Sequence, residues 1–299
     1  MKISYLSDKF FNRLETLALN LRTDLTGYFG GKHLVSTYGQ TVEFADYREY
    51  QFGDDIRRID WNLFSRFEKY FLKLFTDERQ MQVQIFLDCS ASMGKDNPQK
   101  SAYAVAVAAA LGFLSVHNMD KVSFNFMRGT RSENPYGTLV GKQAFFRAVG
   151  GLDELTFDDE VDIRKCVQNC PDTSSGNGLS VIISDFFTDD GWKKAVDYLR
   201  YKRRQVLLVQ ILTPDEDDPL YDGRVNLIDS EAADVLDERN MKLKITRGLQ
   251  HAYQDALRDF KQSIREFCVK READYITIRT DSRIEQVIFG ELLKVGIIG

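Results

Sequence analysis

Strand-like and helix-like segments alternate from Met81 to the end of the chain, and this alternation restricts the fold more than any other feature. Strands are expected at Met81–Leu87, Lys121–Met127, Leu179–Ser184, Gln205–Leu212 and Tyr275–Arg279. Helices are expected between and after them, at Pro98–His117, Lys142–Leu152, Ile163–Cys170, Trp192–Tyr201, Leu249–Arg271 and Ile284–Leu293. Apolar strands separated by helices are typical of a mostly parallel sheet with helices on both faces. The sequence therefore predicts a three-layer α/β fold.

The N-terminal part of the chain has a different pattern. Residues from Leu6 to about Leu25 have the apolar spacing of an amphipathic helix, and a region rich in glycine and aromatic residues follows. Short strands and loops are expected from His33 to Phe75, with a strand at Lys69–Phe75. We predict that residues 1–79 form a helix and a β-rich region packed on the core. Residues 80–299 are predicted to form the main domain, with a small β excursion near 213–247.

The segment Gly53–Asn62 (GDDIRRIDWN) combines three acids, two arginines and a tryptophan. It is either an interaction surface or a cluster of ion pairs that fastens the N-terminal region to the sheet. The second interpretation is favoured, because arginines readily form bidentate pairs with carboxylates. The aromatic residues around it are expected in the core rather than on a docking face; they are Phe44, Tyr47, Tyr50, Phe52, Trp61, Phe64 and Phe67.

Charge and composition exclude several classes of protein. The formal net charge is −5 and no segment carries a sustained basic run, so a nucleic-acid interface is not expected. The densest basic segment, Arg200–Arg204, reads as a helix C-terminus, where cations interact favourably with the helix dipole. The N-terminus does not read as a signal peptide, and Ala102–Val116 is too short to span a membrane and reads as a buried helix. The four cysteines read as reduced thiols, so we expect a cytoplasmic protein.

No pattern in the chain supports catalysis. The three histidines are scattered, no serine or cysteine lies in a nucleophile elbow, and there is no P-loop motif. We therefore predict no catalytic residues.

Oxygen-bearing side chains follow two of the predicted strands. Asp88, Ser90 and Ser92 alternate directly after the first core strand, and Asp185 follows the strand Leu179–Ser184. Because the carboxyl ends of parallel strands meet at one edge of a sheet, these side chains are expected to converge there. Hard cations such as Mg²⁺ prefer oxygen ligands and keep several waters. The sequence therefore predicts a site for Mg²⁺ or Mn²⁺ with one open position. In the alternative, a serine caps the following helix and Asp88 only binds backbone amides.

The motifs around these residues resemble a known family. The run LDCSASMG, followed by an Ala-rich helix, is similar to the metal-ion-dependent adhesion site of von Willebrand factor A-like domains. The run VEFADYREYQFGDDIRRIDWN from Val42 to Asn62, leading through DERQMQVQIFLDCSASM, resembles the bacterial family called "domain of unknown function fifty-eight". This resemblance covers nearly everything after about Gly27.

The resemblance implies a fold, a ligand set and a partner. The fold would be a von Willebrand factor A-like, Rossmann-like sheet, with Asp88, Ser90, Ser92 and Asp185 at the metal site. The usual threonine ligand would fall at Val161, which has no oxygen. Asp162, Asp159 or water would then substitute, or the metal would bind weakly. The implied partner is a MoxR-type AAA+ ATPase, in protein assembly, maturation or stress response.

The leading hypothesis is thus a non-enzymatic, metal-dependent adaptor in which a partner's Asp or Glu completes the coordination of the ion. A second hypothesis is a metal-assisted hydrolase or phosphoryl-transfer enzyme that uses Asp88. Ser90 stands where such phosphatases commonly have a second aspartate, and no general acid is evident. A third is a metal-free interaction module, because Val161 replaces a ligand.

Overall fold

The structure is a computed structural model of the whole chain. It describes residues 6–20, 42–52, 54–77, 81–94, 97–158, 160–171, 178–188, 190–219, 223–227, 241–245, 247–287 and 290. Two compact units are present: residues 1–30 with 81–299, and residues 31–80. The upper limit of the second unit lies next to the boundary expected from sequence, whereas the first thirty residues group with the main unit.

A six-stranded sheet forms the centre of the main unit. Its spatial order is β10 (Asp274–Arg279), β7 (Gln205–Leu212), β6 (Gly178–Ser184), β3 (Gln82–Asp88), β4 (Lys121–Arg128) and β5 (Arg131–Glu133). All neighbours pair in parallel except β4 and β5. The mostly parallel sheet predicted from sequence is confirmed. The short antiparallel edge strand β5 was not predicted, since three residues are too few to show a period.

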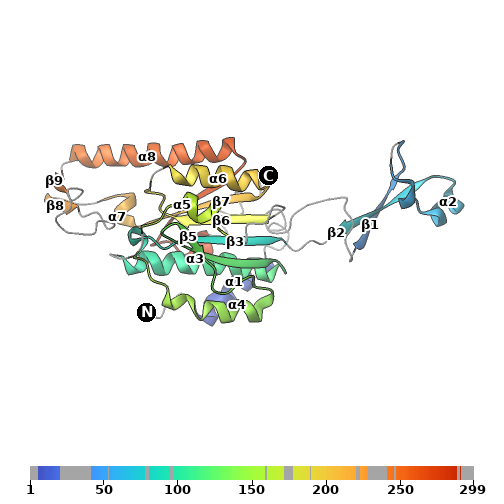
Figure 1. Ribbon diagram of the computed structural model, residues 1–299, viewed down its shortest axis with the longest axis horizontal. Helices are drawn as coiled ribbons and strands as arrows, with labels where there is room; N and C mark the ends of the chain where they lie inside the picture. Colours follow the sequence, from blue (N-terminus) through green and yellow to red (C-terminus); the bar gives the residue numbers. More distant parts are fainter. Residues whose placement is uncertain are drawn as a thin grey trace. The chain divides into compact units, whose positions relative to one another are not determined.

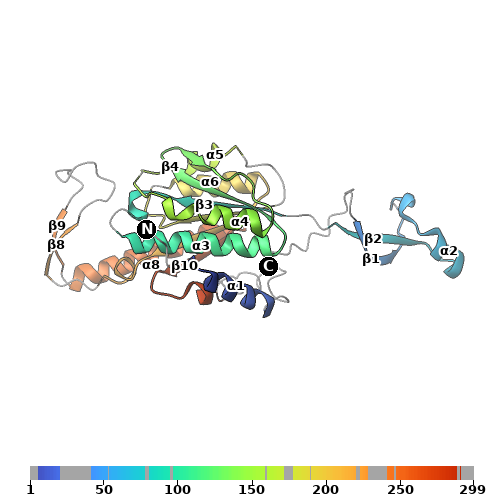
Figure 2. The ribbon, with the colours of Figure 1, turned by 90° about the horizontal axis from the view of Figure 1, so that it is seen from below.

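Helices cover both faces of this sheet (Figure 1). The helices on one face, seen in Figure 2, are α1 (Asp8–Asn20), α3 (Pro98–His117) and α4 (Gly141–Val149). The helices on the other face are α5 (Ile163–Gln168), α6 (Gly191–Tyr201) and α8 (Arg247–Lys270). Two apolar clusters, one on each side of the sheet, match these layers. Alternate strand side chains point to opposite faces, so Ile85 packs toward α3 and Phe86 toward the α5 and α6 face.

Helix α3 is the central element of the first face. Every residue from Lys100 to Val116 is buried except Ser101, as the Ala-rich sequence predicted. This helix is long and apolar enough to cross a membrane. However, 89% of its most apolar 18-residue stretch is buried inside the protein. Phe11 of α1 packs on Phe113 of α3, with ring centroids 5.3 Å apart. The N-terminal helix is thereby fixed to the main unit.

Further elements lie in the segment where a β excursion was expected. They are α7 (Pro214–Asp217), β8 (Gly223–Leu227) and β9 (Met241–Ile245), the two strands pairing antiparallel. Of the helix predicted at Ile284–Leu293, one helical turn at residues 284–287 is described, and most of the rest lies outside the described residues.

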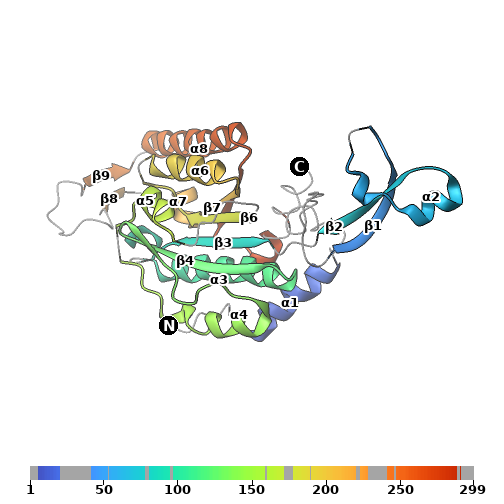
Figure 3. The ribbon, with the colours of Figure 1, turned by 45° about the vertical axis from the view of Figure 1, so that its right-hand side comes forward.

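The second unit contains an antiparallel pair and short helices (Figure 3). The elements are β1 (Val42–Glu49), η2 (Ile56–Arg58), α2 (Trp61–Phe67) and β2 (Phe71–Asp77). Several aromatic residues predicted to be core are exposed, among them Phe52, Trp61 and Phe67. The prediction was wrong because an eight-residue strand paired with a seven-residue one buries few side chains.

Two acids of Gly53–Asn62 cap helices and a third pairs with an arginine. Asp55 caps η2, and Asp60 caps α2 by accepting from the backbone of Asn62. Asp54 does form an ion pair, with Arg48 at 2.9 Å. Asp55 and Asp60 therefore act as helix N-caps, a role that aspartate favours strongly.

The basic segment Arg200–Arg204 lies at the C-terminus of α6, as expected, and Arg204 has a further role. Its side chain is buried and donates to Ser180 Oγ at 2.6 Å and to the carbonyls of Gln82 and Leu179 at 2.8 Å. Burial lowers the pKa of its guanidinium to about 10. It joins β3 to β6 at the amino edge of the sheet, opposite the predicted metal site.

A buried carboxyl group at the amino edge, Asp120, gives a testable pH dependence. Burial raises its pKa to about 6, and Oδ1 accepts from Met81 N at 2.9 Å. Because the folded-state pKa exceeds the unfolded one, stability falls as pH rises between about pH 4 and pH 6. In Asp120→Asn, the loss of unfolding free energy between about pH 4 and pH 8 should shrink by about 3 kcal/mol. Urea denaturation at the two pH values measures this difference, and an unchanged pH dependence would contradict it.

Candidate metal centre

The predicted site residues lie at one point of the carboxyl edge of the sheet. Leu87 of β3 pairs with Ile183 of β6, so Asp88 lies beside Ser184 and one step from Asp185. After β3 the chain enters α3 on one face, and after β6 it enters α6 on the other (Figure 1). Adjacent strands whose connections leave on opposite faces form a switch point, the usual ligand position in such sheets.

Asp88 is completely buried. Its Oδ1 accepts from Ser90 N at 2.9 Å and its Oδ2 from Ser184 Oγ at 2.6 Å. Burial, followed by the nearby charge of Asp185, raises the pKa of its carboxyl to about 6, despite the hydrogen bonds from Ser184 and Ser90. Asp88 forms no ion pair among the residues that the structure describes.

The hydroxyls of Ser90 and Ser92 lie 3.1 Å apart, close to Asp88. Ser90 directly precedes a short 3₁₀ turn, η3 (Ala91–Met93), and Ser92 lies within it. Ser90 makes no side-chain capping bond to this turn. Helix α3 is instead capped by Asn97, which accepts from Lys100 N. The alternative in which a serine caps the helix is therefore wrong. Its other part, a bond from Asp88 to a backbone amide, is observed.

Asp185 is also buried and lies directly after β6. Its Oδ1 accepts from Phe187 N at 3.1 Å. The next residue, Phe186, has φ of 60°, in the left-handed region that bulky side chains rarely adopt. Such strain is concentrated at functional sites, where it fixes a side chain in place. Here it follows the carboxylate immediately.

Lys100 is a member of this cluster that sequence reasoning missed. Its ammonium donates to Asp185 Oδ2 at 2.9 Å, to Glu216 Oε1 at 2.7 Å and to the Ser92 carbonyl at 3.2 Å. Its side chain is 1% exposed, and lysines are rarely buried unless paired. Burial lowers its pKa, but Asp185 and Glu216 outweigh this effect and raise it. Lys100 is therefore a charged group at the centre of the site.

Glu216 reaches Lys100 from α7. It forms a capping box with Thr213, each side chain binding the backbone of the other residue. The pattern T-x-x-E was legible in the sequence as a helix start. The signal for Lys100 was its position, because a lysine in the first turn of an otherwise apolar helix needs a charged partner when it is buried.

The position expected to supply a threonine does not contribute an oxygen. Val161 is buried in the apolar cluster of the second face and forms a β-bridge with Gly129. Of the substitutes considered, Asp162 caps α5 by accepting from Lys165 N at 2.9 Å and pairs with Lys165 Nζ at 3.0 Å. Asp159 lies outside the described residues.

The donor set nevertheless fits a hard dication. Asp88 supplies a buried carboxylate with no cationic partner in the described part of the chain, and Ser90 and Ser92 supply adjacent hydroxyls. Asp185 supplies a second carboxylate beside it. The described residues contain no group of three or more His, Cys, Asp or Glu side chains suited to a metal. The site is instead one of two carboxylates and two hydroxyls, an oxygen chemistry that suits Mg²⁺ or Mn²⁺.

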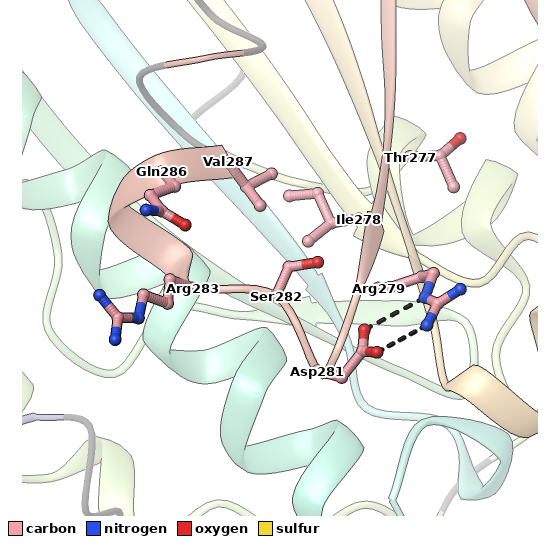
Figure 4. A pocket seen from close by; sticks show the side chains of 8 residues that line it. All are labelled: Thr277, Ile278, Arg279, Asp281, Ser282, Arg283, Gln286 and Val287. Atoms are coloured by element: carbon pink, nitrogen blue, oxygen red, sulfur yellow. Dashed lines mark hydrogen bonds and ion pairs between the residues drawn. The ribbon is translucent and has the colours of Figure 1, made fainter.

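A cavity of about 580 Å³ opens elsewhere, at the end of β10 (Figure 4). Arg279 and Asp281 line it and bind each other through two hydrogen bonds, at 3.1 and 2.6 Å. None of the four predicted metal ligands lines this cavity. The metal prediction therefore rests on the geometry of the sheet edge.

Comparison with known protein families shows which family the chain belongs to. The model of the family described as "Protein of unknown function DUF58" matches residues 46–262, well over half of the sequence. The chain belongs to this family. The matched DUF58 region includes Asp88, Ser90, Ser92, Lys100, Asp185 and Glu216.

Curated relatives of this DUF58 protein include Uncharacterized protein Mb1516 of Mycobacterium bovis and Uncharacterized protein Rv1480 of Mycobacterium tuberculosis. Each is 28% identical over 227 residues, which covers 74% of this chain and 71% of the relative.

Several solved structures are similar in outline. BatB from Bacteroides thetaiotaomicron is 15% identical with a TM-score of 0.45, covering 73% of this chain and 99% of BatB. A von Willebrand factor type A protein from Catenulispora acidiphila is 8% identical with a TM-score of 0.43. The match covers 88% of this chain and 52% of that protein. Proximal thread matrix protein 1 from the mussel byssus, with a zinc-occupied MIDAS motif, is 13% identical with a TM-score of 0.34, covering 44% and 36%. The strand order and the helix layers of the DUF58 chain are those of a three-layer, Rossmann-like α/β fold.

Proposed function

We propose that this DUF58 protein is a non-enzymatic binding module that recognises a partner protein through a dication at the carboxyl edge of its sheet. The observation that carries the proposal is the buried Asp88 carboxylate, which lies beside the Ser90 and Ser92 hydroxyls and has no cationic partner among the described residues. A buried carboxylate is stable in its charged form only with a cation or several hydrogen bonds. A dication is the partner that this oxygen set suits.

Asp88, Ser90, Ser92 and Asp185 are the residues that would hold Mg²⁺ or Mn²⁺. The ion would supply a positive, Lewis-acidic position for a carboxylate of the partner. The four side chains would hold this ion and neutralise part of its charge. The resemblance to MoxR-associated proteins favours a MoxR-type AAA+ ATPase, or its client, as the partner in a cytoplasmic assembly, maturation or stress function.

The hydrolase alternative has less support from the geometry. Both oxygens of Asp88 accept hydrogen bonds, from Ser90 N and Ser184 Oγ, and the side chain is completely buried. An attacking carboxylate has to present an oxygen to its substrate at close range. The same hydrogen bonds suit a carboxylate whose role is to hold an ion in a fixed position.

The test compares variants at constant Mg²⁺, because an AAA+ ATPase itself uses Mg²⁺ with its nucleotide and chelation would disable both proteins. The immobilised chain is titrated with the MoxR-type ATPase of the same genome by biolayer interferometry. Asp88→Asn and Ser92→Ala should each weaken binding at least about tenfold, a loss of about 1.4 kcal/mol. Asp120→Asn, a buried acid at the opposite edge, should leave binding unchanged. Full binding by folded Asp88→Asn would refute the proposal.

A further inference from the structure

Lys100 brings a positive charge into the site proposed for a dication. Its ammonium lies 2.9 Å from Asp185 Oδ2, and the side chains of both residues are 1% exposed. The cluster holds three carboxylates, those of Asp88, Asp185 and Glu216, and Lys100 is the cation that pairs with two of them. Any dication at Asp88 and Asp185 therefore has an ammonium group as a close neighbour.

We propose that Lys100 is a built-in counter-cation that competes with the dication for Asp185 and so sets how tightly this site binds metal. The inference rests on the proposed function and deepens it, since it names the residue that regulates the same site. Its physical basis is direct charge competition, because like charges a few ångströms apart repel each other and the repulsion is doubled toward a dication.

The surroundings of Lys100 allow it to yield Asp185 without becoming an unpaired buried charge. Glu216 Oε1 at 2.7 Å and the Ser92 carbonyl at 3.2 Å remain as acceptors. Glu216 is held by its capping box with Thr213, and Tyr253 of α8 donates to the Glu216 carbonyl at 2.6 Å. The ammonium thus has a fixed second carboxylate to which it shifts. A lysine paired with Asp185 alone would resist displacement much more strongly.

Metal titration of charge variants tests this competition. Isothermal calorimetry with MgCl₂ and MnCl₂ is performed on the full chain and on Lys100→Met and Lys100→Gln. The second variant keeps a hydrogen-bond donor without the charge. Both should bind the dication at least about tenfold more tightly than the unchanged chain. Lys193→Met, which removes a partly exposed lysine of α6 that pairs with Asp190, should bind as the unchanged chain does.

Two double variants identify the site and the role of Glu216. Adding Asp88→Asn to Lys100→Met should abolish the tight binding, because the dication uses the same carboxylates. Glu216→Gln should weaken metal binding in the unchanged chain, since Lys100 then depends on Asp185. In the Lys100→Met background it should have much less effect. A simple loss of negative charge would weaken binding equally in both backgrounds and would overturn the assigned role of Glu216.

The possible failures separate the two proposals. If the Lys100 variants bind the dication with unchanged affinity, the competition is wrong and the metal-dependent function stands. If no variant binds a dication, the metal-dependent function itself is wrong, and the Lys100 competition with it. If Lys100→Met unfolds in chelator, the melting temperature with and without MnCl₂ is compared for Lys100→Gln. A metal-induced rise no larger than that of the unchanged chain would then refute the competition.

Discussion

Asp88→Asn is expected to abolish the stabilisation of the chain by dications. A ligand present at about one hundred times its Kd stabilises the folded state by about 2.7 kcal/mol, and the variant should show none of this gain. In chelator near pH 8 the variant should be more stable than the unchanged chain, by up to about 3 kcal/mol, because a buried charge has been removed. Urea denaturation with chelator and with MgCl₂ measures both effects.

Asp120→Asn is the matched control for this experiment. Burial raises the pKa of both Asp88 and Asp120 to about 6, but they lie at opposite edges of the sheet. Only Asp88 lies beside the serine hydroxyls. The Asp120 variant should therefore keep the full stabilisation by Mg²⁺. Equal stabilisation of the Asp88 variant by Mg²⁺ would place the dication elsewhere.

The gain in stability expected for Asp88→Asn in chelator indicates that the proposed metal site is a locally unfavourable part of the fold. A buried carboxylate that lacks a cationic partner in the described part of the chain and the left-handed backbone of Phe186 both lower stability, and they lie at the same edge of the sheet. Departures from locally favourable structure are expected where function requires them. The amino edge also has a buried carboxylate, Asp120, and left-handed residues, Met119 and Arg203. The feature that distinguishes the carboxyl edge is therefore the pair of serine hydroxyls close to Asp88.

The layers and the strand ends were predictable because their signals are local. Periodicity located β3 and β6 to within a residue or two, and the placement of Asp88 and Asp185 at one edge followed from the parallel arrangement. Ser90 and Ser92 followed from their alternation with Asp88.

The cationic part of the site was not predictable in the same way. Lys100 meets Asp185 across 85 residues of sequence and Glu216 across 116. No period or motif links such positions. Only the fold, which brings the first turn of α3 against α7 and the end of β6, defines the contact. The exposed aromatic residues of the second unit were mispredicted for a related reason, since burial depends on how much structure surrounds a strand.

The Lys100–Asp185 pair itself is expected to show the largest coupling in the chain. In chelator, Asp185→Asn leaves the ammonium with Glu216 as its remaining carboxylate, and Lys100→Met leaves the buried Asp185 carboxylate without its cation. Breaking a buried pair from one side costs about 3–5 kcal/mol. The double variant should cost much less than the sum of the two, because the charge lost from each partner no longer leaves the other without its contact. Urea denaturation of the four proteins gives the coupling energy.

The exposed pair Lys193–Asp190 provides the comparison for this cycle. Its atoms lie 2.6 Å apart, closer than those of the buried pair, but its side chains are 33% and 75% exposed. Surface pairs contribute about 0–1 kcal/mol, so the same cycle with Lys193→Met and Asp190→Asn should show almost no coupling. Burial, and not distance, is thus the variable that separates the two pairs. Additive effects for Lys100 and Asp185 would mean that water reaches the ammonium, and the competition proposed for this lysine would lose its physical basis.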